Sequence, residues 1–300
     1  MSERTFKKNE ITEGVIWKQL LIFFFPIMLG TLVQQFYTTV DTIIVGRFVG
    51  KAALASVGGP AAVIANIVIT FFNGLANGAA VIIAQYYGSR DEKRLHVGLH
   101  TAYAFSIMTS IAVTVVGVIG TPHFLKWMNT PEDMMADSTI YLRVYFLGII
   151  FTLVYNMGAA IMRAAGDSRR PLLYLVVCSV MNIILDIVMV VFLHMGIAGA
   201  ALATVISQCI SAALVTYSLM HAYDVMKLKL REIRMNMSVL AKELKIGIPG
   251  ALQACAYGVT NVIIQAVVNG FGTDTAAGWA AYGKLDMIFW TVNSALGVAV

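Results

Sequence analysis

The chain has 300 residues, of which 59% are hydrophobic and 12% are charged, and its formal net charge is +5. Soluble domains contain about 25% charged residues, and a single soluble core could not hide this much apolar surface. The composition therefore excludes a secreted disulfide scaffold and a disordered protein and argues against a soluble enzyme. It predicts an all-α polytopic membrane protein.

Eight apolar stretches are long enough to cross a membrane, because a transmembrane helix needs about 20 mostly apolar residues. They are too continuous for transmembrane β-strands, which alternate polar and apolar residues. The first stretch is also too long for a cleavable signal peptide. In chain order, the predicted spans cover residues 17–45, 54–84, 95–120, 135–162, 171–193, 196–221, 244–270 and 276–300.

The basic residues predict which side of the membrane each loop occupies. Cytoplasmic loops carry an excess of Lys and Arg, and 16 of the 21 basic residues fall on one side if the N-terminus is cytoplasmic. The opposite side holds only Arg47, Lys51 and Lys126. This distribution explains the net charge without a nucleic-acid partner. The residues assigned to the cytoplasmic side are Arg4, Lys7, Lys8, Lys18, Arg90, Lys93, Arg94, Arg163, Arg169, Arg170, Lys227, Lys229, Arg231, Arg234, Lys242 and Lys245.

A weak internal repeat relates the first and seventh spans. Pro26 and Phe48 recur as Pro249 and Phe271, at a spacing of 223 residues, and a turn rich in Gly and Ala follows each Phe. Six spans separate the copies, so both have the same orientation, which is typical of a parallel repeat of two six-helix lobes. We expect an N-terminal lobe of helices 1–6, a cytoplasmic linker and the first two helices of an incomplete C-terminal lobe, covering 1–222, 223–243 and 244–300.

Acidic residues inside membrane spans are the main functional signal. Only Asp41, Asp186 and Asp286 lie well within spans, where a carboxylate costs on the order of 2.5–3.5 kcal/mol. Asn182 and Asp186 are four residues apart and share a helix face. Counted from the outer span ends, Asp41, Asp186 and Thr204 all lie roughly 7–12 Å deep at about 1.5 Å per residue. Two close buried carboxylates cannot both ionise cheaply, so the group could carry a proton or ligate Na⁺, or it could only tie helices together.

Other polar residues of the N-terminal lobe are candidates for a substrate cavity. Gln34, Tyr37 and Asn156 could line it, although ordinary hydrogen bonds between helices explain them about equally well. Pro26 interrupts the backbone ladder of the first span and is a candidate hinge, or an ordinary membrane proline.

Metal binding and redox chemistry are not predicted, and we expect no cofactor. His96 and His100 are four residues apart, but the sequence shows neither a third ligand nor an HExxH motif beside them. Cys178, Cys209 and Cys255 lie in apolar runs without CxxC spacing, as small packing residues do.

Several segments resemble the multidrug and toxic compound extrusion (MATE) family. They are FFFPIMLGTLVQQFYTTVDTIIVGRFVG, IAQYYGSRDEKRL, MRAAGDSRRPLLYLVVCSVMNIILDIVMV, GIAGAALATVISQ and KIGIPGALQ, in family order over nearly the whole chain. The resemblance implies two six-helix lobes around a central cavity. In the branch with an acidic ion site in the N-terminal lobe, the matching positions are Asp41, Asn182, Asp186 and Thr204. The other branch has a Glu where this chain has Tyr257.

The leading hypothesis from the sequence is a secondary antiporter, not an enzyme, since no nucleophile elbow or phosphate-binding loop is present. It would export amphipathic, often cationic, drugs or toxic metabolites by alternating access, driven by H⁺ or Na⁺. We expect a monomer in the cell membrane with its N-terminus in the cytoplasm, and we expect residues 1–300 to insert but not to transport. The alternative is a lipid-linked saccharide flippase of the same superfamily. A flippase should line its cavity with Arg or Lys, and the first two spans offer no such cluster.

Overall fold

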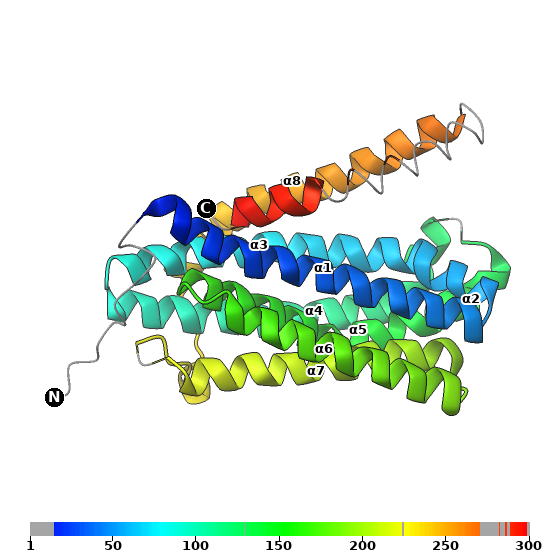
Figure 1. Cartoon of the computed structure of the whole chain (residues 1–300), viewed down its shortest axis with the longest axis horizontal. Helices are drawn as coiled ribbons and strands as arrows, with labels where there is room; N and C mark the ends of the chain where they lie inside the picture. Colours follow the sequence, from blue (N-terminus) through cyan, green and yellow to red (C-terminus); the bar gives the residue numbers. More distant parts are fainter. Residues whose placement is uncertain are drawn as a thin grey trace.

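Long helices packed side by side make up the protein, as Figure 1 shows for the computed structural model. The structure describes residues 15–128, 130–223, 225–270 and 289–298, together with residues 282 and 286. Six helical segments in this part of the chain are long and apolar enough to cross a membrane. The prediction of an all-α polytopic fold is confirmed.

The helix bounds follow the predicted spans closely at most ends. The seventh span differs, because its helix begins at Met237, seven residues before the apolar stretch that starts at 244. The elements are α1 (Ile16–Phe48), α2 (Lys51–Ser56), the π-helical turn η1 (Val57–Ala61), α3 (Ala62–Gly88), α4 (Glu92–Trp127), α5 (Glu132–Ala164), α6 (Arg169–Asp186), the π-helical turn η2 (Ile187–Phe192), α7 (Gly196–His221), the 3₁₀ turn η3 (Leu230–Glu232) and α8 (Met237–Gly270).

The connection between η2 and α7 is a tight helical hairpin. Leu193 donates its backbone N–H to Val188 at 2.9 Å, and Met195 donates to Met189 at 2.9 Å. His194 and Gly196 adopt positive φ values of 52° and 58°, which reverse the chain within three residues. This hairpin fixes the register of α6 against α7.

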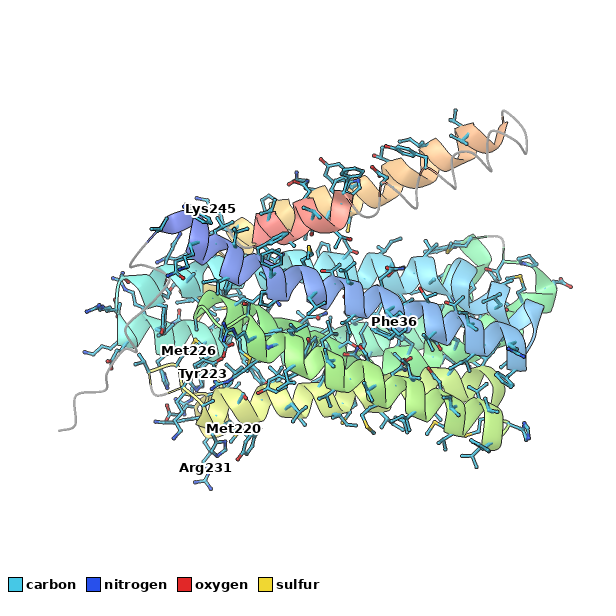
Figure 2. All side chains as sticks on the ribbon, in the orientation of Figure 1. Phe36, Met220, Tyr223, Met226, Arg231 and Lys245 are labelled. Atoms are coloured by element: carbon cyan, nitrogen blue, oxygen red, sulfur yellow. The ribbon has the colours of Figure 1, made fainter. Side chains whose placement is uncertain are left out.

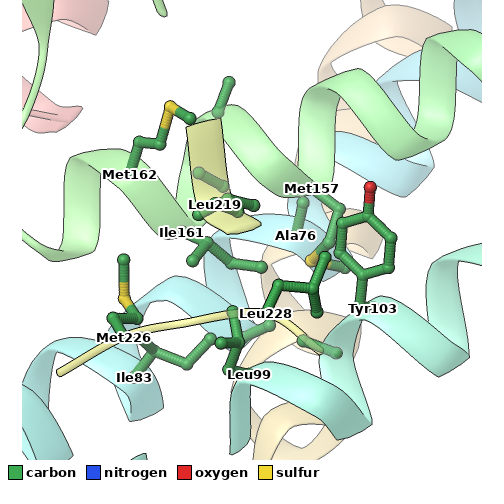
Figure 3. Packing of buried hydrophobic residues seen from close by; sticks show 14 of the residues in the cluster. Ala76, Ile83, Leu99, Tyr103, Met157, Ile161, Met162, Leu219, Met226 and Leu228 are labelled. Atoms are coloured by element: carbon green, nitrogen blue, oxygen red, sulfur yellow. The ribbon is translucent and has the colours of Figure 1, made fainter. Parts of the chain in front are cut away.

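The largest hydrophobic cluster lies between α3, α4, α5 and α7 near the end of the bundle where the linker crosses. Figure 3 shows Met226 and Leu228 of the linker beside Ile83, Leu99 and Leu219. On the outside, large apolar side chains such as Phe36 are exposed (Figure 2), as expected where helices face lipid. The linker is therefore part of the packed core of this lobe.

Polar contacts also hold the linker on α4. His100 is buried and accepts the backbone N–H of Lys229 at Nε2 over 3.1 Å, while its Nδ1 contacts the carbonyl of His96 at 2.7 Å. His96 Nε2 lies 3.0 Å from Glu232, which also accepts from Lys229 Nζ at 2.8 Å. No third ligand for the two histidines is evident in the sequence, and the structure places Glu232 beside them. Both ring nitrogens of His100 are engaged by backbone, so the cluster ties the linker down.

Helix α8 touches the first lobe through small residues of α3. A methyl group added to Gly74 would lie 2.4 Å from the Cα of Ala251, and one added to Gly78 would lie 2.4 Å from the Cα of Gly247. Glu243 lies at the same contact and is 3% exposed. Figure 1 shows α8 close to α3 at this end and diverging from it toward the other. Among the described residues, α3 and α8 therefore pack closely at the linker end and separate toward the other end.

Candidate functional site

A cavity of about 500 Å³ runs through the first lobe, walled by α1, α3, α5, α6 and α7 and reached by residues 294–298 of the last described helix. The sequence-predicted candidates that line this cavity are Pro26, Gln34, Tyr37, Asp41, Asn156 and Thr204. Helix α1 supplies four of these six residues. The cavity is therefore bounded by one face of α1 opposite the α5–α7 wall.

Asp41 and Asp186 meet at one end of this cavity. Their carboxyl groups lie within hydrogen-bonding reach of each other, and Asp186 is fully buried. Apart from this contact, Asp41 Oδ1 and both carboxyl oxygens of Asp186 are buried without a hydrogen-bond partner among the described residues. Two carboxylates this close repel each other in a low-dielectric site. One proton or one small cation between them would remove that repulsion.

Asn182 and Thr204 lie beside the acid pair and connect α6 to α7. Asn182 is 1% exposed, and its Nδ2 donates to Thr204 Oγ1 at 3.5 Å. Thr204 in turn donates to the carbonyl of Ala200 at 3.1 Å. Asn182 Oδ1 is buried with no partner among the described residues, and so is Gln208 Oε1 on the next turn of α7. The structure thus brings the four predicted residues together, and Gln208 lines the cavity one turn further along α7.

Sequence reasoning missed two tyrosines of α5. Tyr141 interacts electrostatically with both Asp41 and Asp186, and its ring stacks on Tyr145 with centroids 6.2 Å apart. Both line the cavity. In a sequence, buried aromatic residues look like ordinary core, so only their i, i+4 spacing on one face could have indicated them.

Arg163 is a cavity residue that the sequence did not indicate. The sequence assigned it to the cytoplasmic side after the fourth span, and the structure shows that its side chain lines the cavity. Arg163 belongs to the last turn of α5, far along the helix from Tyr141. The cavity therefore carries acids at one end and a guanidinium at the other.

Two further residues singled out in the sequence, Pro26 and Tyr257, lie on α1 and α8. Pro26 lies inside α1 and faces the cavity, where it leaves one carbonyl of the helix without its usual N–H donor. Tyr257 lies on α8, is 53% exposed and packs edge-on against Trp290 with centroids 5.9 Å apart. The hinge role of Pro26 stays a prediction.

Taken together, the helices and the cavity define a multi-pass membrane protein with a polar chamber in its first lobe. The MatE family model matches residues 26–188, and the chain therefore belongs to the MATE family. The probable multidrug resistance protein YpnP of Bacillus subtilis is 33% identical over 98% of this chain and 65% of its own length. The multidrug export protein MepA of Staphylococcus aureus is 24% identical over 90% of this chain and 60% of its own length.

Solved structures agree on the fold. A MOP superfamily transporter from Pyrococcus furiosus superposes with a TM-score of 0.88 at 24% identity, over 98% of this chain and 65% of that one. MATE structures in a bent and in a straight conformation each give a TM-score of 0.89 at 24% identity over the same shares of the two chains. The chain thus spans just under two thirds of the length of these relatives.

Proposed function

We propose that this chain forms the first lobe, and part of the second, of an ion-coupled secondary antiporter. It would export amphipathic drugs or toxic metabolites from the cytoplasm by alternating access. Uptake of H⁺ or Na⁺ at Asp41 and Asp186 would drive export. The relatives are named as multidrug resistance and multidrug export proteins, which supports a transporter of small molecules rather than an enzyme.

The acid pair is the observation that carries this proposal. A buried carboxyl pair whose oxygens lack other partners exchanges a proton or a small cation more readily than one held by fixed donors. Asn182 and Thr204 add neutral oxygens at the same place, which suits either ion. Gln34, Tyr37 and Asn156 line the same cavity, so bound substrate and bound ion would share one chamber.

The basic residues support a cell-membrane location with the N-terminus in the cytoplasm. Figure 2 shows Arg231 and Lys245 at the same end of the bundle, which would be the cytoplasmic end. The contact between α3 and α8 is closed at this end, as in an outward-facing transporter. We propose that the transporter works as a monomer, because the N-terminal lobe holds the whole ion site.

The lipid-linked saccharide flippase is the weaker alternative. A pyrophosphate headgroup calls for a cluster of cationic side chains, and Arg163 is the one Lys or Arg among the described residues that line the cavity. The relatives' names also favour drug export.

Dye efflux from right-side-out vesicles containing the full-length protein tests the proposal. Asp41→Asn and Asp186→Asn should each abolish gradient-driven efflux, because an amide keeps the volume but cannot exchange a proton. Glu92→Gln, an exposed acid in the first turn of α4, is the matched control and should leave efflux unchanged. Imposing H⁺ and Na⁺ gradients separately identifies the coupling ion. Full efflux by both aspartate variants would refute the ion site.

A further inference from the structure

Arg163 is a half-buried cation without a fixed counter-ion. Among the described residues, no carboxylate forms an ion pair with it and no side chain or backbone group hydrogen-bonds its guanidinium. It interacts electrostatically with the hydroxyl of Tyr155, which already donates to the carbonyl of Pro171 at 3.2 Å. The neighbouring Arg170 differs, because it pairs with Asp167 at 3.4 Å. The guanidinium of Arg163 is therefore available to a ligand.

The acid pair is too far away to neutralise this cation. Tyr141, which interacts with Asp41, and Arg163 are 22 residues apart on α5, or roughly 33 Å at about 1.5 Å per residue. The Coulomb interaction between two unit charges falls with distance, so at this separation the acid pair is no counter-ion for Arg163. Among the described cavity-lining residues, Asp41 and Arg163 are the two with formal charges. An acidic group near Arg163 would thus be attracted locally and would not be repelled by the distant carboxyl pair.

The surroundings of Arg163 suit an amphipathic molecule with an acidic end. A guanidinium offers donors in a planar fork that matches the two oxygens of a carboxylate. Ser168 adds a buried hydroxyl at this end of the cavity. Leu172, Leu175 and Ala295 supply apolar wall nearby. Anion recognition and apolar contact are available at one place.

We propose that the linker end of the cavity binds the carboxylate of an amphipathic solute through Arg163. This contact would hold the acidic end of the solute at the linker end of the cavity. This inference rests on the proposed transport function for its biological meaning, because the bound solute would be the exported substrate. The contact itself is a binding site and needs no ion gradient.

Two dyes that differ by one ester group test this site. Rhodamine 19 carries a free carboxylate, and rhodamine 6G is its ethyl ester. Fluorescence anisotropy with the purified full-length protein in phosphatidylcholine nanodiscs would measure both affinities. A charge-assisted hydrogen bond predicts that the wild type binds the acid roughly tenfold more tightly than the ester. Arg163→Gln should remove this ratio with ester affinity unchanged, and Arg163→Lys should keep part of it.

The control is Arg169→Gln, which removes an exposed cation six residues away and should preserve the ratio. A wild type without preference for the acid, or an Arg163→Gln variant that weakens both dyes equally, would overturn the proposal. Repeating the assay with phosphatidylglycerol in the disc separates two sources of the anion. Competition by this lipid would show that the site also accepts a lipid phosphate, and lack of competition would show selectivity for the solute. Loss of efflux in the aspartate variants leaves this binding ratio intact, so the two proposals fail separately.

Discussion

The close approach of α3 and α8 gives a quantitative prediction. In Gly74→Ala the new methyl group would lie 2.4 Å from the Cα and 2.6 Å from the backbone nitrogen of Ala251. Carbon atoms in contact are normally about 3.5–4.0 Å apart, so the helices must separate by about 1 Å. The obstacle is backbone and cannot rotate away. Overpacking of this kind costs about 1–3 kcal/mol.

The matched control is Gly250→Ala on α8, where an added methyl group meets nothing within 4 Å. Alanine is favoured over glycine in a helix by about 0.5–1 kcal/mol, so this variant should be neutral or more stable. Chemical denaturation of the purified protein, followed by tryptophan fluorescence, compares the free energies of unfolding. Both glycines lie inside helices and gain the same propensity, so Gly74→Ala should fall below Gly250→Ala by about the overpacking cost, about 1–3 kcal/mol. Equal stabilities would show that α3 and α8 are not in contact at Gly74.

Three further predictions concern the ion site, the closed contact and the orientation. Thr204→Val should reduce efflux about two- to tenfold, less than either aspartate change, because one neutral hydrogen bond is worth about 0.5–1.5 kcal/mol; dye efflux in vesicles measures it. Burial raises the pKa of Glu243, which precedes the 244–270 span, from 4.5 to about 8. The folded state then holds this proton more tightly than the unfolded state, so stability falls as the pH rises from about 4.5 to about 8. The melting temperature of Glu243→Gln should match that of the wild type near pH 4.5 and exceed it above pH 8. A difference in melting temperature that does not change with pH would contradict the raised pKa of Glu243. An impermeant thiol reagent applied outside should modify a cysteine placed at Glu132 and spare one placed at Asn236; the reverse pattern would invert the topology.

The helices and the acid pair could be predicted from the sequence because each leaves a strong one-dimensional signal. The span expected at 196–221 has the bounds of α7, and carboxylates in apolar runs are too costly to be accidental. The start of α8 was missed because its first seven residues include Ser238, Lys242 and Glu243, which a hydropathy criterion leaves out of an apolar stretch. The span expected at 276–300 lies mostly outside the described residues.

The role of Arg163 as a cavity-lining residue was missed for a different reason. Basic residues near span ends usually point to the headgroups, and only the packing of α5 against its neighbours decides which of them turn inward. Gln208 and Tyr141 were missed for a similar reason, because a polar or aromatic residue in a span shows no preference for one face until the helices are assembled. The direction of a side chain around a helix in a bundle is set by tertiary contacts, and one sequence does not contain them explicitly.

The hairpin of η2 and α7 has a mechanical consequence for the acid pair. Asp186 and Thr204 lie on the two arms of this hairpin. Backbone hydrogen bonds hold its three-residue turn on both sides, so the two residues move together as one rigid unit. Asp41 belongs to α1, a separate helix that contains Pro26. A change in the distance between the two carboxyl groups therefore has to come from a displacement of α1. The hairpin that carries Asp186 stays fixed while α1 moves. The stiffness of α1 near Pro26 therefore sets how far the two carboxyl groups can separate when a proton or cation leaves.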